Sequence, residues 1–195
     1  MHTASLSPVL RSAISRHKPL SPDEERATAS AIWLAREDAW RLVLDDPTAR
    51  SRAVAVLEAT GRADVPEARV DAKDCRALLD ALSTGDPLRI AVADKDDVVL
   101  RLAAGAIAPH LRASIRSCLV RLDAAVARLE RHNVALVVHV ARRCYSIALG
   151  DATRKANRKG EPPMRLAGVI ELDDLVAWGM IHLRTAALRF DSRRG

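Results

Sequence analysis

The side chains that could perform chemistry are few and scattered in this sequence. His132 and His139 lie seven residues apart, so a helix would place both on one face. No cluster of carboxylates or thiols surrounds them to complete a metal site, and the sequence lacks an HExxH motif, a P-loop and a glycine-rich nucleotide fingerprint. We therefore interpret the two histidines as solvated or core-edge side chains. The sequence predicts neither an enzyme nor a bound cofactor.

The remaining reactive or charged candidates also have simpler explanations. Cys75, Cys118 and Cys144 are widely spaced and form no CxxC pair, which is untypical of zinc sites and disulfide frameworks and favours the cytoplasm. The charged run from Asp94 to Asp97 fits the N-terminal end of a helix better than a catalytic dyad. No apolar run reaches ~18 residues, so no membrane span is predicted. The first residues also lack the apolar core of a signal peptide.

The composition favours an all-α protein. Of the 195 residues, 49% are hydrophobic but only 3% are aromatic. Alanine, leucine and arginine are strong helix formers, whereas strands are typically richer in aromatic and β-branched residues. The net charge of +6 permits an acidic partner such as nucleic acid, but 31 basic residues are largely offset by 25 acidic ones. Charge alone therefore gives only weak support to nucleic-acid binding.

A helical hairpin is predicted over residues 21–60. Ser21 and Glu24 form a capping box, which marks the start of the first helix. A second helix is expected at residues 48–60, after an Asp-Pro pair that ends the first. Residues 1–20 are interpreted as a flexible arm with at most one short turn of helix.

Further helices are expected downstream. Residues 61–108 should contain short helices at 71–82 and 94–108. The longest periodic stretch predicts one helix of almost forty residues at 111–149. Residues 150–168 interrupt the pattern with three glycines and two prolines, so we expect a basic, mobile loop.

That predicted loop has two interpretations. It is either an ordinary solvated connector or an electrostatic contact with phosphates. In the second interpretation the nucleic-acid-binding side chains would be Arg154, Lys155, Arg158 and Lys159.

The C-terminal residues carry the most specific pattern. A final helix is predicted to begin at residues 171–174, where acidic side chains complement the positive end of the helix dipole. Together with the turn that follows it, this segment resembles region 2.2 of the bacterial sigma-70 family, the promoter-specificity subunits of RNA polymerase. The matching residues are Asp174, Leu175, Val176, Gly179, Ile181, Leu183, Ala186, Phe190, Asp191 and Gly195.

Two other segments resemble the same family in the expected order. Residues 133–144 are similar to region 2.1, whose pattern they follow at Asn133, Leu136, Val137, Val138, Val140 and Ala141. Residues 19–25 are similar to the opening of region 1.2, so 61–108 would occupy the place of the variable insertion. The resemblance implies an all-α helical bundle like the sigma-70 region 2 domain. Residues 109–195 would form the region 2.1 and 2.2 helices of that domain, which is incomplete in this sequence. Because the family's strand-separating segment does not follow Gly195, we expect the N-terminal portion of a longer factor.

The resemblance also implies a partner and a binding face. Members of the family dock this helix on the coiled coil of the polymerase β′ subunit. The residues implied to bind core RNA polymerase are Val134, Val137, Asp174, Ala177, Trp178, Met180 and Arg184. On the final helix we expect Asp174, Trp178, Met180 and Arg184 to project outward, and Leu175, Ile181, Leu183 and Phe190 to project inward.

The implied function is transcription initiation, with promoter DNA as a second partner in the full-length context and an anti-sigma factor as a possible third. An alternative is a regulatory interaction module that occupies the polymerase or anti-sigma binding surface without initiating transcription. A weaker alternative is a basic helical bundle that binds nucleic acid directly through residues 150–168.

Overall fold

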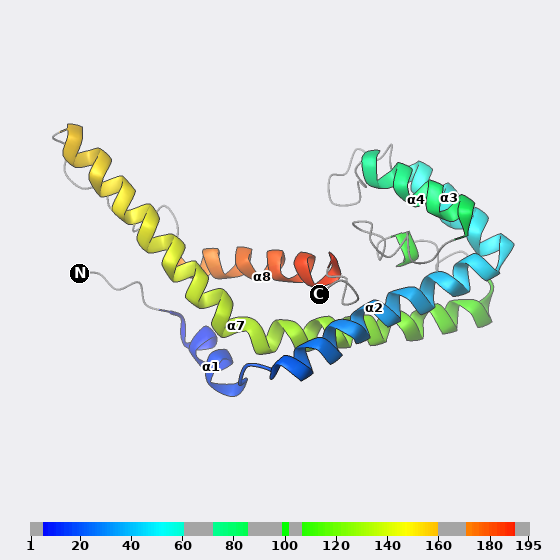
Figure 1. Cartoon of the computed structure of the whole chain (residues 1–195), viewed down its shortest axis with the longest axis horizontal. Helices are drawn as coiled ribbons and strands as arrows, with labels where there is room; N and C mark the ends of the chain where they lie inside the picture. Colours follow the sequence, from blue (N-terminus) through cyan, green and yellow to red (C-terminus); the bar gives the residue numbers. More distant parts are fainter. Residues whose placement is uncertain (1–5, 61–71, 86–98, 102–106, 160–170, 190–195) are drawn as a thin grey trace. The chain divides into compact units, whose positions relative to one another are not determined.

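The computed structural model describes residues 6–60, 72–85, 99–101, 107–159 and 171–189 (Figure 1). The regular structure within these ranges is helical, which confirms the predicted all-α class. The helices are α1 (Pro8–Arg16), α2 (Pro22–Asp45), α3 (Pro47–Thr60), α4 (Ala72–Thr84), α7 (Pro109–Lys159) and α8 (Leu172–Arg189).

Several predicted elements can be compared with these bounds. Helices α2, α3 and α4 agree with the predicted helices to within two residues. The helix predicted at residues 94–108 lies largely outside the described residues, although the stretch 99–101 is helical. The end of the C-terminal motif, from Phe190 onward, also lies outside them.

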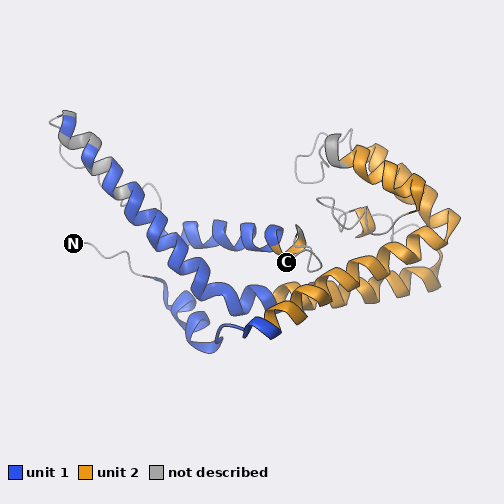
Figure 2. Ribbon diagram, in the orientation of Figure 1, with its two compact units in different colours: residues 1–23, 128–186 blue, residues 24–127, 187–195 orange. Residues whose placement is uncertain are grey.

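The chain divides into two compact units (Figure 2). Unit 1 comprises residues 1–23 and 128–186, and unit 2 comprises residues 24–127 and 187–195. Helix α7 contributes to both units. This division differs from the domain boundaries predicted after residues 20, 60 and 108.

The difference at residue 108 has a simple packing reason. The first part of α7 belongs to unit 2, where Leu111 and Ile115 are buried. In the same unit, Arg121 on α7 lies 2.9 Å from the carboxylate of Asp38 on α2. The beginning of α7 therefore completes the unit that contains the α2–α3 hairpin.

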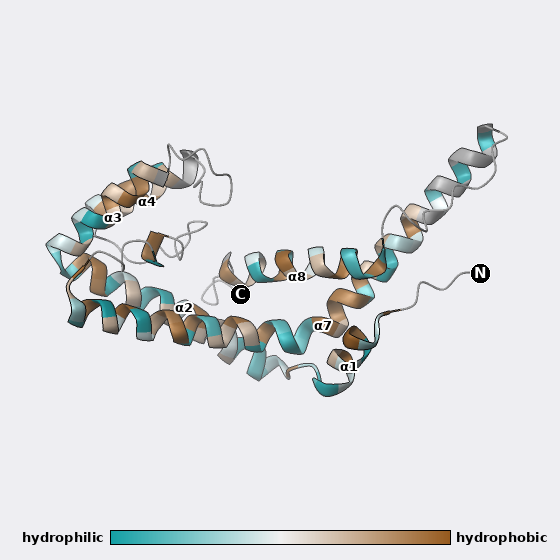
Figure 3. Ribbon diagram, turned by 180° about the vertical axis from the view of Figure 1, so that it is seen from behind, coloured by the Kyte–Doolittle hydropathy of each residue, from teal (hydrophilic) through white to brown (hydrophobic). Residues whose placement is uncertain are grey.

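Unit 2 has an apolar core supplied by α2, α3, α4 and α7. Hydrophobic and hydrophilic residues alternate along α2 and α7, as is typical of amphipathic helices (Figure 3). The largest buried apolar side chains of this unit are Ile32, Trp40, Val43, Leu57, Leu78, Leu82, Leu100, Ile115 and Leu122.

Helix ends in unit 2 are closed by local polar contacts. Asp46 accepts a 2.7 Å hydrogen bond from the amide of Ala49, which makes it the N-cap of α3, and Pro47 occupies the first helical position. Arg50 on α3 donates to the carbonyl oxygens of Leu82 and Ser83 at the end of α4. The Asp46 cap and Pro47 explain why the α2–α3 turn was predictable from sequence.

Gly85 terminates α4, and Arg36 binds the C-terminal end of α8 in this unit. Gly85 follows α4 with a φ of +72°, and its amide donates a 3.0 Å hydrogen bond to Ala81. This left-handed conformation after a helix favours glycine. Arg36 is only 2% exposed, and its guanidinium donates to the carbonyl oxygen of Leu188. A buried charge at this position is stabilised by orphan carbonyls at the end of α8.

The predicted flexible arm is a folded part of unit 1 in its described portion. Ser7 caps α1 by accepting a 3.3 Å hydrogen bond from the amide of Leu10. Leu6 is buried, and Leu10 and Ile14 pack against the apolar core formed by α7 and α8. The prediction of a flexible arm is therefore wrong for these residues, because their burial depends on helices more than 100 residues away in the sequence.

The predicted loop at residues 150–168 is also wrong in its first part. Helix α7 continues through Gly150 to Lys159, and residues 160–168 lie outside the described part. One glycine in a helix interior costs only about 1 kcal/mol relative to alanine. The alanine, arginine and lysine residues that follow are strong helix formers and outweigh it.

Candidate protein-docking groove

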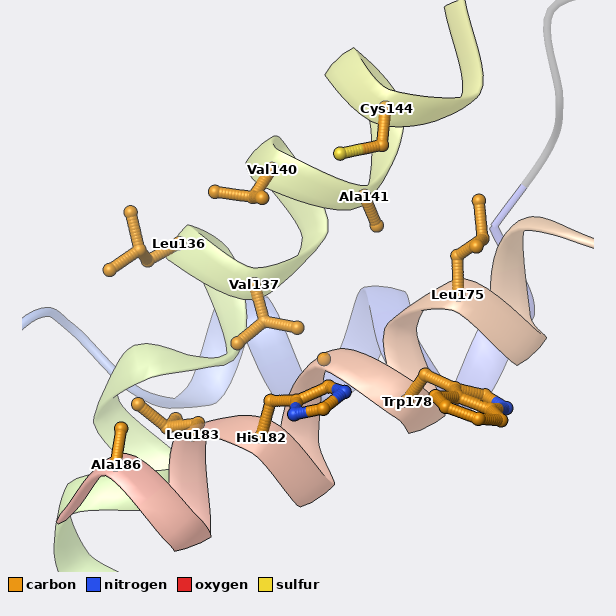
Figure 4. A pocket seen from close by; sticks show the side chains of 11 residues that line it. Leu136, Val137, Val140, Ala141, Cys144, Leu175, Trp178, His182, Leu183 and Ala186 are labelled. Atoms are coloured by element: carbon orange, nitrogen blue, oxygen red, sulfur yellow. The ribbon is translucent and has the colours of Figure 1, made fainter. Parts of the chain in front are cut away.

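An apolar groove lies between α7 and α8 in unit 1 (Figure 4). Its volume is about 460 Å³. Figure 4 shows Cys144 and Leu175 toward one end of the groove and Leu136 and Ala186 toward the other. The residues that line it are Leu136, Val137, Val140, Ala141, Cys144, Leu175, Trp178, Gly179, His182, Leu183 and Ala186.

The floor of the groove is the core of unit 1. Its buried members are Leu6, Val134, Val137, Val138, Ala141, Leu172 and Val176. On α7 these positions recur every three or four residues, as expected for the inward stripe of a helix. The groove therefore lies on a packed base rather than in a loop.

The start of α8 is fixed by its own acidic residues. Asp173 and Asp174 occupy the first turn, where negative charge is favourable. The Asp174 carboxylate accepts a 3.3 Å hydrogen bond from the amide of Glu171. This is the backward half of a capping box, and it sets the register of α8.

Gly179 sets the separation between the two helices. A Cβ atom added to Gly179 would lie 2.5 Å from Cγ1 of Val137. This distance is far below an ordinary carbon–carbon contact of about 3.5–4.0 Å. The glycine therefore lets α8 lie close to α7 at this point.

The walls of the groove expose large apolar side chains. Trp178 on α8 is 66% exposed, while Leu136 and Val140 on α7 are 56% and 50% exposed. Ile181 does not line the groove, but it is 64% exposed one turn after Trp178 on α8. The indole of Trp178 lies beside the ring of His182, with 6.0 Å between ring centroids. Apolar side chains gathered in this way are typical of a protein-interaction surface.

Three of the predicted polymerase-binding residues lie at the surface, as expected for a docking face. Asp174, Ala177 and Trp178 are exposed on α8. Arg184 is half-buried, and its guanidinium lies 3.6 Å from Glu130 on α7. Trp178, at 66% exposed, is therefore an accessible predicted anchor.

Other predicted positions are corrected by the structure. Val134 and Val137 are each only 8% exposed and belong to the core, although Val137 also lines the groove. Met180 was expected to project outward but is partly buried against the same core. Ile181 was expected to point inward, yet it is mostly exposed. Leu175 and Leu183 pack against the core of unit 1, as predicted. The most deeply buried apolar residues of α8 are Leu172, Val176 and Ala187.

Leu136, Val140 and Cys144 are groove residues that the sequence prediction missed. The first two match the region 2.1 pattern and were not assigned to the binding face. The signal that could have found them is the width of the apolar face of α7. Around residue 136 the helix carries more apolar residues than one inward stripe requires.

The predicted nucleic-acid-binding residues lie at the far end of α7. Arg154 and Arg158 are exposed, and the side chains of Lys155 and Lys159 are outside the described part. Arg154 is 3.8 Å from Asp151, a distance and exposure that make the ion pair weak. These residues extend a helix rather than a loop.

The two histidines singled out from the sequence do not form a site together. A ring nitrogen of His132 is 2.5 Å from the carbonyl oxygen of Lys18, and its ring lies 5.4 Å from that of His17. His139 is exposed. Within the described ranges, no group of three potential metal ligands is present.

Comparison with protein-family models, with curated proteins and with solved structures found no match. Among the described helices, none combines the length and apolar character needed to cross a membrane.

Proposed function

We propose that this chain is a sigma-70-like transcription initiation factor that binds core RNA polymerase through the α7–α8 groove. The proposed partner element is the coiled coil of the polymerase β′ subunit, and the complex would be directed to promoters in the full-length context. The observation that carries the proposal is the exposure of Trp178 beside an apolar groove, within a segment whose residue pattern resembles region 2.2.

The groove has the properties that docking of a helix requires. A helix seated between two others buries apolar residues at three- and four-residue spacing. The groove offers apolar walls from both α7 and α8, and Asp174 supplies an exposed charge on the same helix as Trp178. Such a surface selects a partner by shape and then by charge at its edge.

Trp178 would contribute most of the affinity. Its side chain is 66% exposed, so docking would bury roughly 130 Å² of a typical tryptophan surface. At about 25 cal/mol per Å² this corresponds to roughly 3 kcal/mol. That value is typical of a hot-spot residue at an interface.

The proposal is tested by removing two exposed apolar side chains of α8, one that lines the groove and one beside it. Trp178→Ala with Ile181→Ala should reduce co-purification with core polymerase at least tenfold, because about 2 kcal/mol or more of binding energy is lost. The matched control is Leu34→Ala with Val120→Ala. These two residues are 53% and 62% exposed but lie in unit 2.

The pair of double variants separates docking from general stickiness. Both remove two exposed apolar side chains, and neither removes a core residue, so helical content should be unchanged. Equal retention of polymerase by the groove variant and the control would overturn the proposed docking face.

A regulatory interaction module is the second candidate. It is favoured by Ala177 and Trp178, which replace the polar residues that the sigma-70 pattern usually has after Asp-Leu-Val. Promoter-dependent transcription by core polymerase with the full-length protein distinguishes the two functions. An initiation factor stimulates specific transcripts, whereas a regulatory module binds polymerase and reduces transcription by another factor.

A further inference from the structure

The exposed face of α7 carries a second regular pattern that continues past the groove. Beyond residue 141 most described residues of α7 are exposed, and one side of the helix can be followed in alternating three- and four-residue steps over about 27 Å. The residues on this side are Leu136, Val140, Arg143, Ile147, Gly150 and Arg154, and we name this stripe the α7 seam. Arg158 follows one turn later.

Such spacing has a specific packing meaning. When the positions of a stripe are on average 3.5 residues apart, the stripe can face a neighbouring helix over many turns. The stripe that α7 directs into the core of unit 1 is a different one, which includes Val134, Val137 and Ala141. The seam is thus a separate, solvent-exposed side of α7 whose spacing would let a neighbouring helix follow it.

The seam has two chemically distinct halves. Its first half is mainly apolar, with Leu136, Val140 and Ile147 each at least half exposed and Arg143 exposed between the last two. Its second half is basic, with Arg154 and Arg158 exposed and carrying long side chains. The carboxylate of Asp151 is 3.8 Å from Arg154 and 62% exposed, so it neutralises little of this charge.

We propose that the α7 seam binds an acidic amphipathic helix of a partner protein. The partner would place apolar side chains against Leu136, Val140 and Ile147, and carboxylates against Arg154 and Arg158. This inference rests on the proposed docking function and adds the chemistry of the partner. It also assigns the residues beyond Gly150 to the same interface as the groove.

A nucleic-acid duplex fits this surface less well. Phosphates would satisfy Arg154 and Arg158 but would leave the exposed apolar half of the seam uncovered. A helix with acidic flanks covers both halves at once. Each arginine can also donate a pair of hydrogen bonds to one carboxylate.

The experiment uses the full chain and two synthetic helical peptides. The first has leucines at alternating three- and four-residue spacing with glutamates on both flanks, and the second has lysines in place of the glutamates. We expect the acidic peptide to bind roughly tenfold more tightly than the basic one. Labelled duplex DNA is the third probe.

Variants then locate the contact. Arg154→Gln with Arg158→Gln should weaken the acidic peptide roughly fivefold, and Arg154→Lys with Arg158→Lys should restore most of the binding. The matched control, Arg52→Gln with Arg116→Gln, removes the same charge from exposed positions in unit 2. It should leave binding unchanged.

Each outcome decides the inference. Equal binding of both peptides, equal loss in the control variant, or tight DNA binding that the seam variant abolishes would overturn it. The test also separates the two proposals, since it does not use polymerase. Acidic-peptide binding without polymerase binding would refute the proposed function and leave the seam assignment standing.

Discussion

Gly179→Ala should destabilise unit 1, although alanine is normally the better residue inside a helix. The added Cβ would lie 2.5 Å from Cγ1 of Val137. Valine in a helix keeps essentially one side-chain rotamer, and Val137 is only 8% exposed, so it cannot move aside easily. Helices α7 and α8 must separate by roughly 1 Å to restore ordinary contact.

The expected magnitude follows from two opposing effects. Overpacking a buried contact costs about 1–3 kcal/mol, and a clash with a stiff side chain belongs near the upper end. Replacing glycine by alanine in a helix returns about 1 kcal/mol. The net loss in unfolding free energy should therefore be about 2 kcal/mol.

Amide hydrogen exchange measures this loss of stability separately for each part of the chain. Peptides covering α8 and residues 134–141 of α7 should open more readily in Gly179→Ala, whereas peptides from α3 and α4 should not change. Gly150→Ala is the matched control, because a Cβ at Gly150 has nothing within 4 Å. That variant should be stabilised by about 0.5–1 kcal/mol.

A double variant identifies the contact itself. In a Val137→Ala background the clashing methyl is absent, so adding Gly179→Ala should be neutral or stabilising by up to about 1 kcal/mol. If Gly179→Ala alone stabilises the protein as Gly150→Ala does, the close approach of α7 and α8 is wrong.

Three further predictions concern other parts of the chain. Burial, with a smaller effect of Glu58, raises the pKa of the Cys75 thiol. At pH 8 a maleimide should therefore modify the exposed Cys144 first, and it should modify Cys75 only on unfolding or at higher pH, as measured by mass spectrometry. Gly85→Ala should lower the stability of unit 2 by about 1 kcal/mol in urea unfolding, because its φ of +72° strains any side chain. Leu6→Ala should lower the opening free energy measured by hydrogen exchange in α7 and α8 by about 2 kcal/mol, since Leu6 is buried in their core.

Local sequence signals accounted for much of unit 2. The end of α2 and the start of α3 follow from Asp46 and Pro47, whose effects act within one helical turn. Arg36 shows the limit of such signals. The partner of Arg36 is a carbonyl oxygen 152 residues away, and no local pattern indicates that a charged residue will be buried there.

Long-range packing explains the errors in unit 1. Leu6 and Ile14 are covered by the core of α7 and α8, which lies more than 100 residues away in the sequence. The exposed side of α8 was predicted correctly at Asp174 and Trp178, which are one turn apart. Ile181 was misplaced because an apolar residue was assumed to be buried, whereas at an interface such residues are solvent-exposed until the partner binds.

The most direct test of the docking groove is solvent protection of Trp178 in the presence of core RNA polymerase. Hydroxyl-radical footprinting of the full chain reports side-chain oxidation at Trp178 and Ile181, with Leu34 and Val120 as exposed references in unit 2. The docking function predicts strong protection of Trp178 and Ile181 and unchanged oxidation of the two references. Polymerase binding that leaves Trp178 as reactive as in the free protein would contradict it.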